Sequence, residues 1–98
     1  RYINWINEVC DENNVIEKKW FGINYWEKIP DEQMINTAKL CSKLCDKYNI
    51  QKKCVDFNLY HKDIIKYNGI VFRSNYIENS IDINPLFDIE KFNELLLM

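Results

Sequence analysis

The sequence predicts an α/β fold in which helices cover a sheet. Three observations carry this prediction: an apolar stripe with helical spacing over residues 31–48, a β-rich stretch over residues 15–26, and a second helical pattern that begins near Asp88. An amphipathic segment, 1–12, precedes them and a short β-branched segment, 54–59, lies between them. The order helix, strand, helix, strand, helix favours a sheet covered by helices, because each apolar face has to pack on another element.

Residues 1–12 are expected to form an amphipathic helix, with Asn13 and Asn14 as a loop behind it. The apolar side chains on its predicted inner face are Tyr2, Ile3, Trp5, Ile6, Val9 and Cys10. The stretch from Val15 to Trp26 is rich in β-branched and aromatic residues that alternate loosely with charged ones, which is typical of a strand. Gly22 marks the place where this strand is expected to be interrupted.

The segment 31–48 is the clearest helix of the sequence. Pro30 is tolerated beside the first turn, and Asp31 and Glu32 are placed against the positive end of the helix dipole. The stripe predicted to face the core is about 120° wide and contains Met34, Thr37, Ala38, Cys41, Leu44, Cys45 and Tyr48. The opposite face, with Lys39, Lys43 and Asp46, is predicted to be solvated, and Asn49 to end the helix.

The C-terminal half is less regular. Residues 54–59 predict a short strand, and residues 69–73 fit either a strand or an extended loop. Pro85 precedes a last helix, for which Asp88 is a suitable N-cap. The face of this helix that is predicted to be buried carries Ile89, Phe92, Leu95 and Leu96.

Length and composition limit the classes of protein. A chain of 98 residues forms one domain or part of one, and 47% apolar residues can supply its core. The net charge of −2, with lysines scattered among acids, gives no basic surface for phosphates, so nucleic acid is not an expected partner. The longest apolar run, 95–98, is far shorter than the ~20 residues of a membrane span, so we expect a soluble protein. The cellular location stays open.

The first residue is Arg1, and no apolar stretch that resembles a secretion signal follows it. This predicts either a processed chain or an excerpt of a longer one.

Four cysteines occur, at positions 10, 41, 45 and 54. Cys41 and Cys45 lie four residues apart on one face of the expected helix, and their parallel Cβ vectors suit a disulfide poorly, so we expect reduced thiols. One hypothesis is a metal site built from Cys41, Cys45, Cys54 and His61. The alternative is that the cysteines are small buried hydrophobic residues, since the two-residue ligand spacing of structural zinc modules is missing.

The sequence gives little support for a nucleotide-binding site or a glycoside-hydrolase site. Gly22 and Gly69 are the only glycines, so a glycine-rich phosphate loop is not formed. The carboxylate pairs Asp31 with Glu32 and Asp88 with Glu90 are best interpreted as helix N-terminal acids. Aromatic residues that could stack on sugars are Trp5, Trp20, Tyr25 and Trp26, although core packing is the competing interpretation.

Two stretches are similar to the C-terminal half of the zinc-dependent N-acetylmuramoyl-L-alanine amidases and peptidoglycan-recognition proteins. The first runs from Trp20 through Glu27 and Pro30–Gln33 to the helix end Leu44–Ile50. The second, Asp82–Phe92, resembles the closing Asp-Pro-Gly-Pro-x-Phe segment of that family and its last helix. Residues 15–98 are therefore the family-like region of a single partial domain, 1–98, in which residues 1–14 supply the helix and loop.

The resemblance implies a mixed sheet flanked by helices. It also implies a site where zinc, held by two histidines and an Asp or Cys, activates water against the lactyl-amide bond of peptidoglycan. Asp82 occupies the place of the acidic ligand. The second histidine is expected where this chain has Phe57, which cannot bind a metal, and His61 lies four residues further on as the only histidine. Asp82 and His61 are thus the candidate metal ligands. The alternative interpretations are that Asp82 is a loop or cap residue and that His61 is a surface residue.

The resemblance places the first histidine in an N-terminal half that this chain lacks, so we expect another chain or that missing half as a partner. The lysine expected just before the acidic ligand is also absent, since Ser80 and Ile81 stand there. One histidine and one aspartate do not make a three-ligand zinc site. The sequence thus predicts an amidase-like cell-wall domain that is degenerate or incomplete and inactive alone. The alternatives are a non-catalytic module of a larger assembly on the same scaffold and an unrelated helical interaction domain.

Overall fold

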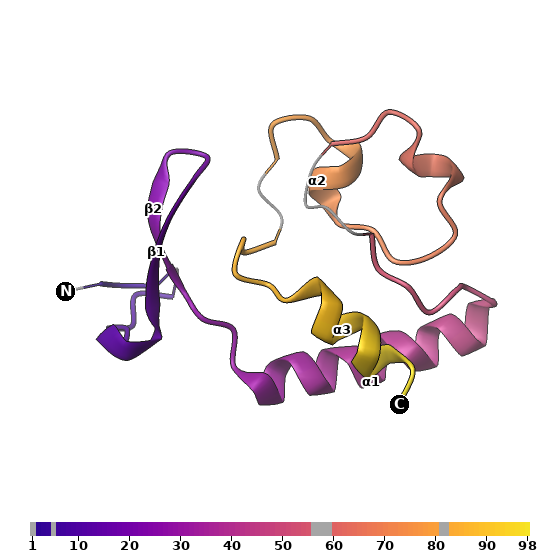
Figure 1. Ribbon diagram of the computed structural model, residues 1–98, viewed down its shortest axis with the longest axis horizontal. Helices are drawn as coiled ribbons and strands as arrows, with labels where there is room; N and C mark the ends of the chain where they lie inside the picture. The colour runs from indigo at the N-terminus through magenta and orange to yellow at the C-terminus, as the bar shows by residue number, and fades with distance from the viewer. Residues whose placement is uncertain (1, 5, 56–59, 81–82) are drawn as a thin grey trace.

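The structure is a computed structural model that describes residues 2–4, 6–55, 60–80 and 83–98. It contains both helices and strands, as predicted. The regular elements are the strands β1 (Val15–Trp20) and β2 (Ile23–Glu27), the helices α1 (Asp31–Tyr48), α2 (Arg73–Tyr76) and α3 (Ile89–Leu96), and short 3-10 turns at Glu12–Asn14 and Ile64–Lys66. The molecule is elongated, 44 × 30 × 21 Å, with the β1–β2 hairpin at one end and the helices at the other (Figure 1). None of the described helices has the length and apolar character that a membrane span requires.

The predicted N-terminal helix is wrong for the residues that the structure describes. Ile3 and Val9 form an antiparallel bridge instead, and the amide of Cys10 donates to the carbonyl oxygen of Tyr2 at 2.8 Å. The reason is the side chain of Asn4, whose Oδ1 accepts hydrogen bonds from the backbone N–H of residues 6 and 8 at 3.1 and 3.0 Å. Asparagine side chains offer the backbone such alternatives to a helix.

The predicted strand is confirmed as the two strands of a hairpin. β1 and β2 pair antiparallel, with Trp20 opposite Ile23, and the register shifts between Glu17 and Trp20. Phe21 and Gly22 form the turn with φ values of 48° and 76°, the left-handed geometry of a two-residue hairpin, so the break at Gly22 is where the sequence predicts it. Across the strands, Trp26 Nε1 donates to the carbonyl oxygen of Lys18 at 2.8 Å.

The helices α1 and α3 have the predicted bounds. α1 ends where Asn49 adopts a left-handed conformation with φ of 56°, and its amide donates to the carbonyl oxygen of Cys45. Asp88 caps α3, because its side chain accepts a hydrogen bond from the amide of Lys91 at 3.0 Å.

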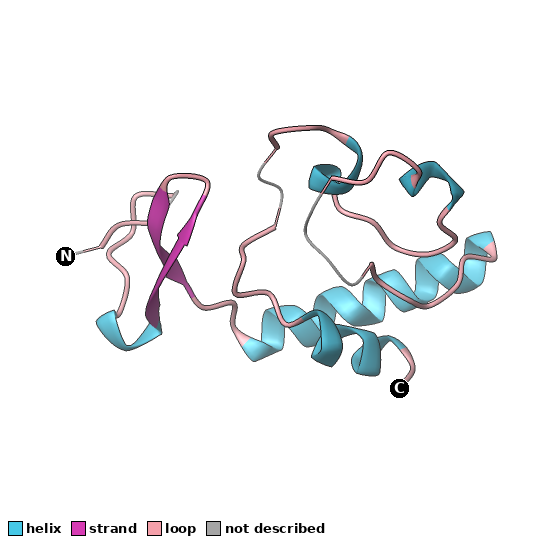
Figure 2. Cartoon of the chain, turned by 45° about the horizontal axis from the view of Figure 1, so that its top comes forward, coloured by secondary structure: helices cyan, strands magenta, loops and turns pink. Residues whose placement is uncertain are grey.

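The core lies where α3 packs along α1 (Figure 2). Its buried side chains are Met34, Ala38, Cys54, Phe92 and Leu96, and partly buried apolar residues from the 70–72 segment and residue 87 pack against them. The ring centroid of Phe87 lies 5.6 Å from that of Phe72 and 5.1 Å from that of Phe92. Aromatic contacts therefore connect the 70–72 segment with α3 through Phe87.

The chain between α1 and α3 is mostly loop in its described parts (Figure 2). The strand predicted for 54–59 is represented by one parallel bridge between Cys54 and Ile70, and residues 56–59 lie outside the described residues. Of residues 69–73, for which the sequence fits a strand or an extended loop, Ile70 forms this bridge, residues 71–72 are extended loop, and Arg73 already begins α2. Gly69 lets the two segments approach, because a Cβ there would collide with the carbonyl oxygen of Lys53.

Two further expectations differ from the structure. In the described residues the sheet is a two-stranded antiparallel hairpin, so the mixed sheet that the resemblance implies is not seen there. The buried stripe of α1 is also narrower than predicted. Met34, Ala38 and Cys45 are buried, but Leu44 and Tyr48 are 43% and 61% exposed. The reason is that the short α3 covers only one side of the apolar face of α1.

Replacing Leu96 by alanine tests whether the α1–α3 contact holds the fold together. Leu96 is fully buried, so Leu96→Ala should lower the free energy of unfolding by about 2–5 kcal/mol in urea denaturation followed by circular dichroism. Leu97→Ala is the matched control, because Leu97 is 74% exposed and its loss should change stability by less than about 0.5 kcal/mol. Equal losses for the two variants would contradict this description of the core.

Candidate functional site

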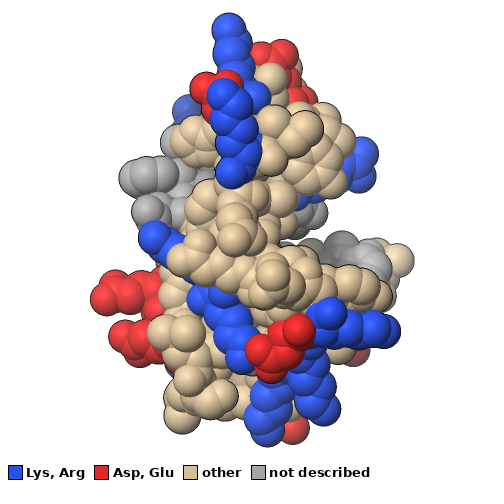
Figure 3. Space-filling view, turned by 90° about the vertical axis from the view of Figure 1, so that its right-hand side faces the viewer, with Lys and Arg blue, Asp and Glu red and all other residues tan. Residues whose placement is uncertain are grey.

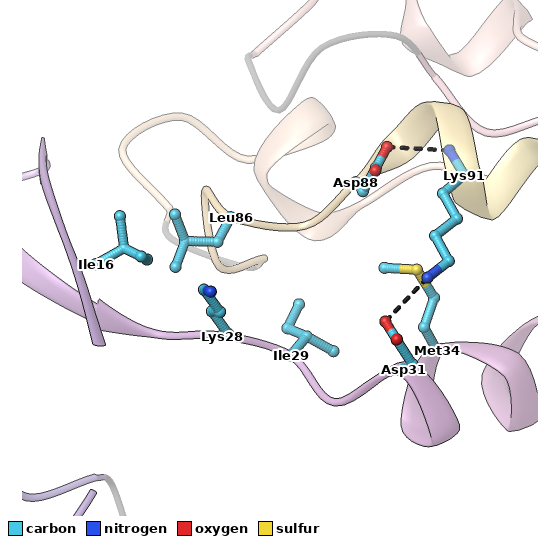
Figure 4. A pocket seen from close by; sticks show the side chains of 8 residues that line it. All are labelled: Ile16, Lys28, Ile29, Asp31, Met34, Leu86, Asp88 and Lys91. Carbon is cyan, nitrogen blue, oxygen red and sulfur yellow. Dashed lines mark hydrogen bonds and ion pairs between the residues drawn. The ribbon is translucent and has the colours of Figure 1, made fainter. Parts of the chain in front are cut away.

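A pocket of about 280 Å³ lies between the hairpin, the start of α1 and the start of α3 (Figure 4). Its apolar walls are aliphatic or thioether side chains, and four charged side chains of both signs stand beside them. The lining residues are Ile16, Lys28, Ile29, Asp31, Met34, Leu86, Asp88 and Lys91. The volume is close to the lower end of small-ligand sites, so the pocket suits a fragment about as large as a dipeptide.

Three contacts position the walls of this pocket. The side-chain amide of Asn84 donates to the carbonyl oxygen of Glu27 at 2.7 Å, and Lys18 Nζ donates to the carbonyl oxygen of Pro85 at 3.5 Å. Both bonds attach the segment before α3 to the hairpin. On the other side, Lys91 Nζ pairs with Asp31 Oδ1 at 2.9 Å and joins α3 to the first turn of α1 (Figure 4).

The charges in the pocket are only partly neutralised. The Lys91–Asp31 pair is solvent-exposed, so it contributes on the order of 0–1 kcal/mol to stability and serves mainly to orient the two side chains. Asp88 is held by its capping bond to the amide of Lys91. Lys28 Nζ has no ion-pair partner among the described residues. The pocket can therefore offer an ammonium donor to an anion and carboxylate oxygens to N–H groups, beside aliphatic walls.

Of the two predicted metal ligands, the structure describes only His61. His61 is exposed, and its backbone amide donates to the carbonyl oxygen of Asn75 at 2.9 Å. Asp82 and Phe57 lie outside the described residues. Among residues 2–4, 6–55, 60–80 and 83–98, no three histidine, cysteine, aspartate or glutamate side chains are grouped so that they could hold a metal ion. The described residues therefore do not fit a three-ligand zinc site by themselves.

The cysteines behave as hydrophobic residues of the interior. No disulfide joins any two of them, and Cys10, Cys45 and Cys54 are buried. The hypothesis of a metal site from Cys41, Cys45, Cys54 and His61 is not supported, because all four residues are described and no such group forms. Cys54 instead belongs to the core, where its amide donates to Asn93 Oδ1 at 2.6 Å.

The aromatic residues proposed for sugar stacking are not assembled into one groove by the described chain. Tyr25 is 45% exposed and its ring stands 4.9 Å from that of Tyr2, while Trp20 and Trp26 are partly buried in the hairpin. Trp5 lies outside the described residues. These side chains cover the hairpin and do not line the pocket.

Sequence analysis missed most of the pocket. It assigned Asp31 and Asp88 only to helix N-termini, which is correct for the capping role of Asp88, and it gave Lys28 and Lys91 no role. Asp31 and Lys91 are 60 positions apart in the sequence, so their ion pair can be predicted only once α3 is known to pack on α1.

No protein-family model, no curated protein and no solved structure matches this chain.

The buried thiol of Cys54 should make stability depend on pH. Burial raises the pKa of Cys54 to about 12 from an ordinary 9.0, the neighbouring Cys41 adds to the rise, and the amide of Val55 opposes it. Between these values the unfolded chain loses a proton that the folded chain keeps, so stability should fall as the pH rises from 9 towards 12. Urea denaturation across this range should show a shallower decline for Cys54→Ala than for the unmodified chain. Identical slopes would contradict the assignment.

Proposed function

We propose that this chain is part of an amidase-like domain that binds the stem peptide of peptidoglycan in the pocket and does not hydrolyse it alone. One observation carries the proposal: residues from both stretches that resemble the amidases line the same pocket. Asp31 belongs to the first stretch, Lys28 and Ile29 lie between two of its matched segments, and Leu86, Asp88 and Lys91 come from the second. If the chain is related to the amidases, both stretches are expected to contribute to one functional surface.

The chemistry of the pocket is compatible with a short peptide. Stem peptides offer small aliphatic side chains, backbone amides and carboxylates. Ile16, Ile29 and Leu86 supply apolar contact for such side chains. Lys28 can donate to a carboxylate, and Asp31 can accept from an amide N–H while it remains paired with Lys91.

Catalysis by this chain alone is not part of the proposal. The family mechanism needs two histidine ligands beside the acidic one, and His61 is the only histidine of the sequence. If zinc binds, Asp82 and His61 are the residues that would contribute, and a further histidine would have to come from elsewhere. The metal would supply an activated water.

A second candidate function is a non-catalytic module of a larger assembly on the same scaffold. Its support is the hairpin, where Phe21, Ile23 and Tyr25 are 51%, 42% and 45% exposed. A two-stranded hairpin with so many exposed apolar side chains is marginal in water, so a partner that covers it would stabilise it.

Titration with muramyl dipeptide tests the binding proposal. Isothermal calorimetry should detect binding to the full chain, and Lys28→Gln and Asp31→Asn should each weaken it by about tenfold, because each removes one charged partner. Lys62→Gln is the matched control, since Lys62 is exposed and outside the pocket, and it should bind like the unmodified chain. Absence of binding, or equal weakening by the control, would refute the proposal. Release of L-alanyl peptide from the ligand in the presence of zinc would refute its non-catalytic part.

A gain of zinc affinity tests the alignment behind the resemblance. Phe57→His restores the histidine that the family pattern has at this position, so zinc should bind at least about tenfold tighter than to the unmodified chain in competition with a chelating dye. Phe57→Ala should show no gain, and adding Asp82→Asn to Phe57→His should remove it. Unchanged affinity in Phe57→His would count against the alignment of residues 54–61.

A further inference from the structure

The second half of α1 carries two rows of exposed side chains, which together we call the outer face of α1. The first row is apolar: Leu40, Leu44 and Tyr48 are 58%, 43% and 61% exposed. The second row is basic and consists of the exposed residues Lys39, Lys43 and Lys47. The members of each row are four positions apart, so they lie one above the other along the helix. α1 therefore has an apolar row outside the core as well as the face that packs in it.

The two rows are neighbours on the helix surface. Consecutive residues of an α-helix are about 100° apart around the axis, so each lysine stands beside the apolar residue that follows it. At the end of the helix, Lys47 Nζ lies 5.3 Å from the ring centroid of Tyr48, which brings a charge of one row onto a ring of the other. The outer face thus presents an apolar strip with positive charge along one border.

The lysine row has no anionic partner within the described residues, where none of its three members forms an ion pair. The only acid between residues 39 and 48 is Asp46, and Lys52 engages it at 2.9 Å. A position near the end of a helix suits a single lysine, because the dipole is negative there. Like charges at four-residue spacing nevertheless repel one another, so an anionic surface outside the chain would stabilise the row.

The small size of the outer face distinguishes between two kinds of anionic partner. At a rise of 1.5 Å per residue, the apolar row from 40 to 48 is about 12 Å long. A specific protein interface needs about 20–30 residues a side with complementary shapes, far more than one row of a convex helix supplies. A lipid surface needs no matching shape, because binding to it grows with the apolar area that enters and with each basic residue that reaches it. The outer face therefore fits lipid better than protein.

We propose that the outer face of α1 binds the surface of a membrane that contains anionic lipid. Leu40 and Leu44 enter the boundary between head groups and acyl chains, and Tyr48 keeps its hydroxyl among the head groups. The lysines extend their ammonium groups to the lipid phosphates, with the helix axis parallel to the membrane. The net charge of −2 does not prevent this contact, since exposed charges further away than about 10 Å are largely screened at 0.1 M salt.

The surface of the molecule agrees with this arrangement. Figure 3 looks onto the end of the molecule where α1 terminates, and several basic side chains gather in its lower part, where α1 lies. The pocket lies at the opposite end of this helix. Its lining residue Asp31 begins α1 and is separated from Tyr48 by about 26 Å at 1.5 Å per residue. The proposal is thus independent of what the pocket binds.

The test is co-sedimentation of the full chain with lipid vesicles at about 0.1 M salt. The chain should bind vesicles in which about a quarter of the lipid is phosphatidylglycerol at least about tenfold more tightly than vesicles of phosphatidylcholine alone. The triple change Lys39→Glu, Lys43→Glu, Lys47→Glu should weaken binding to the anionic vesicles at least about tenfold. The matched control changes the net charge equally at exposed sites elsewhere and should bind within about threefold of the unmodified chain. It combines Lys19→Glu, Lys62→Glu and Lys66→Glu.

A second pair of variants tests the apolar row. Leu40→Asn with Leu44→Asn keeps every lysine, and it should also weaken binding to the anionic vesicles at least about tenfold, because less apolar area enters the lipid. Its control is Ile6→Asn with Ile65→Asn, two residues that are 50% and 90% exposed outside the outer face, and it should bind like the unmodified chain. Circular dichroism checks that each variant keeps its helix content.

Four outcomes would overturn the proposal. They are equal binding to neutral and anionic vesicles, a control that weakens binding as much as its matched variant, an apolar double change without effect, and a chain that binds neither kind of vesicle. In the last case the charge pattern of the outer face would point to an acidic protein partner instead of lipid.

Discussion

The packing of α3 on α1 is the contact on which the rest of the structure depends. Phe92 and Leu96 bury themselves against Met34 and Ala38, and Cys54 closes the cluster from the intervening chain. The chain between the helices is mostly loop in its described parts, so it has few regular backbone bonds of its own to hold it. It is fixed by bonds to this core, such as that from the amide of Cys54 to Asn93. The buried residues of this core come from the helices and the chain between them, and none comes from the hairpin.

The pocket is a consequence of that packing. Once α3 lies along α1, its N-terminus comes to the first turn of α1, and Lys91 reaches Asp31. The segment before α3 must then return past the hairpin, where Asn84 bonds to the backbone of Glu27. Three segments that are distant in sequence thus enclose one space with both signs of charge. The same helix pairing also decides which side chains stay outside, including Leu40, Leu44 and the lysines beside them.

Local signals succeeded where a few neighbouring residues decide the conformation. Asn49 ends α1 through its left-handed backbone, Asp88 caps α3, and Gly22 turns the hairpin, each through geometry that the residue type itself favours. The same kind of reasoning failed at residues 2–4 and 6–12, because it considered apolar spacing without the side chain of Asn4, which accepts hydrogen bonds from two backbone amides and favours a turn. The presence of Asn4 within this short amphipathic segment was the sequence signal against a helix.

The sequence by itself determined the helices α1 and α3 with their ends, the β-rich stretch with its break at Gly22, and the buried positions Met34, Ala38, Phe92 and Leu96, since these follow from periodicity, capping and turn chemistry within a few residues. Tertiary structure alone decided that the apolar face of α1 is covered only in part, that Asp31 and Lys91 pair across 60 positions, and that His61 is exposed. These properties depend on which elements meet. Contact between segments far apart in the chain is set by the summed packing of many side chains, and no local pattern records it.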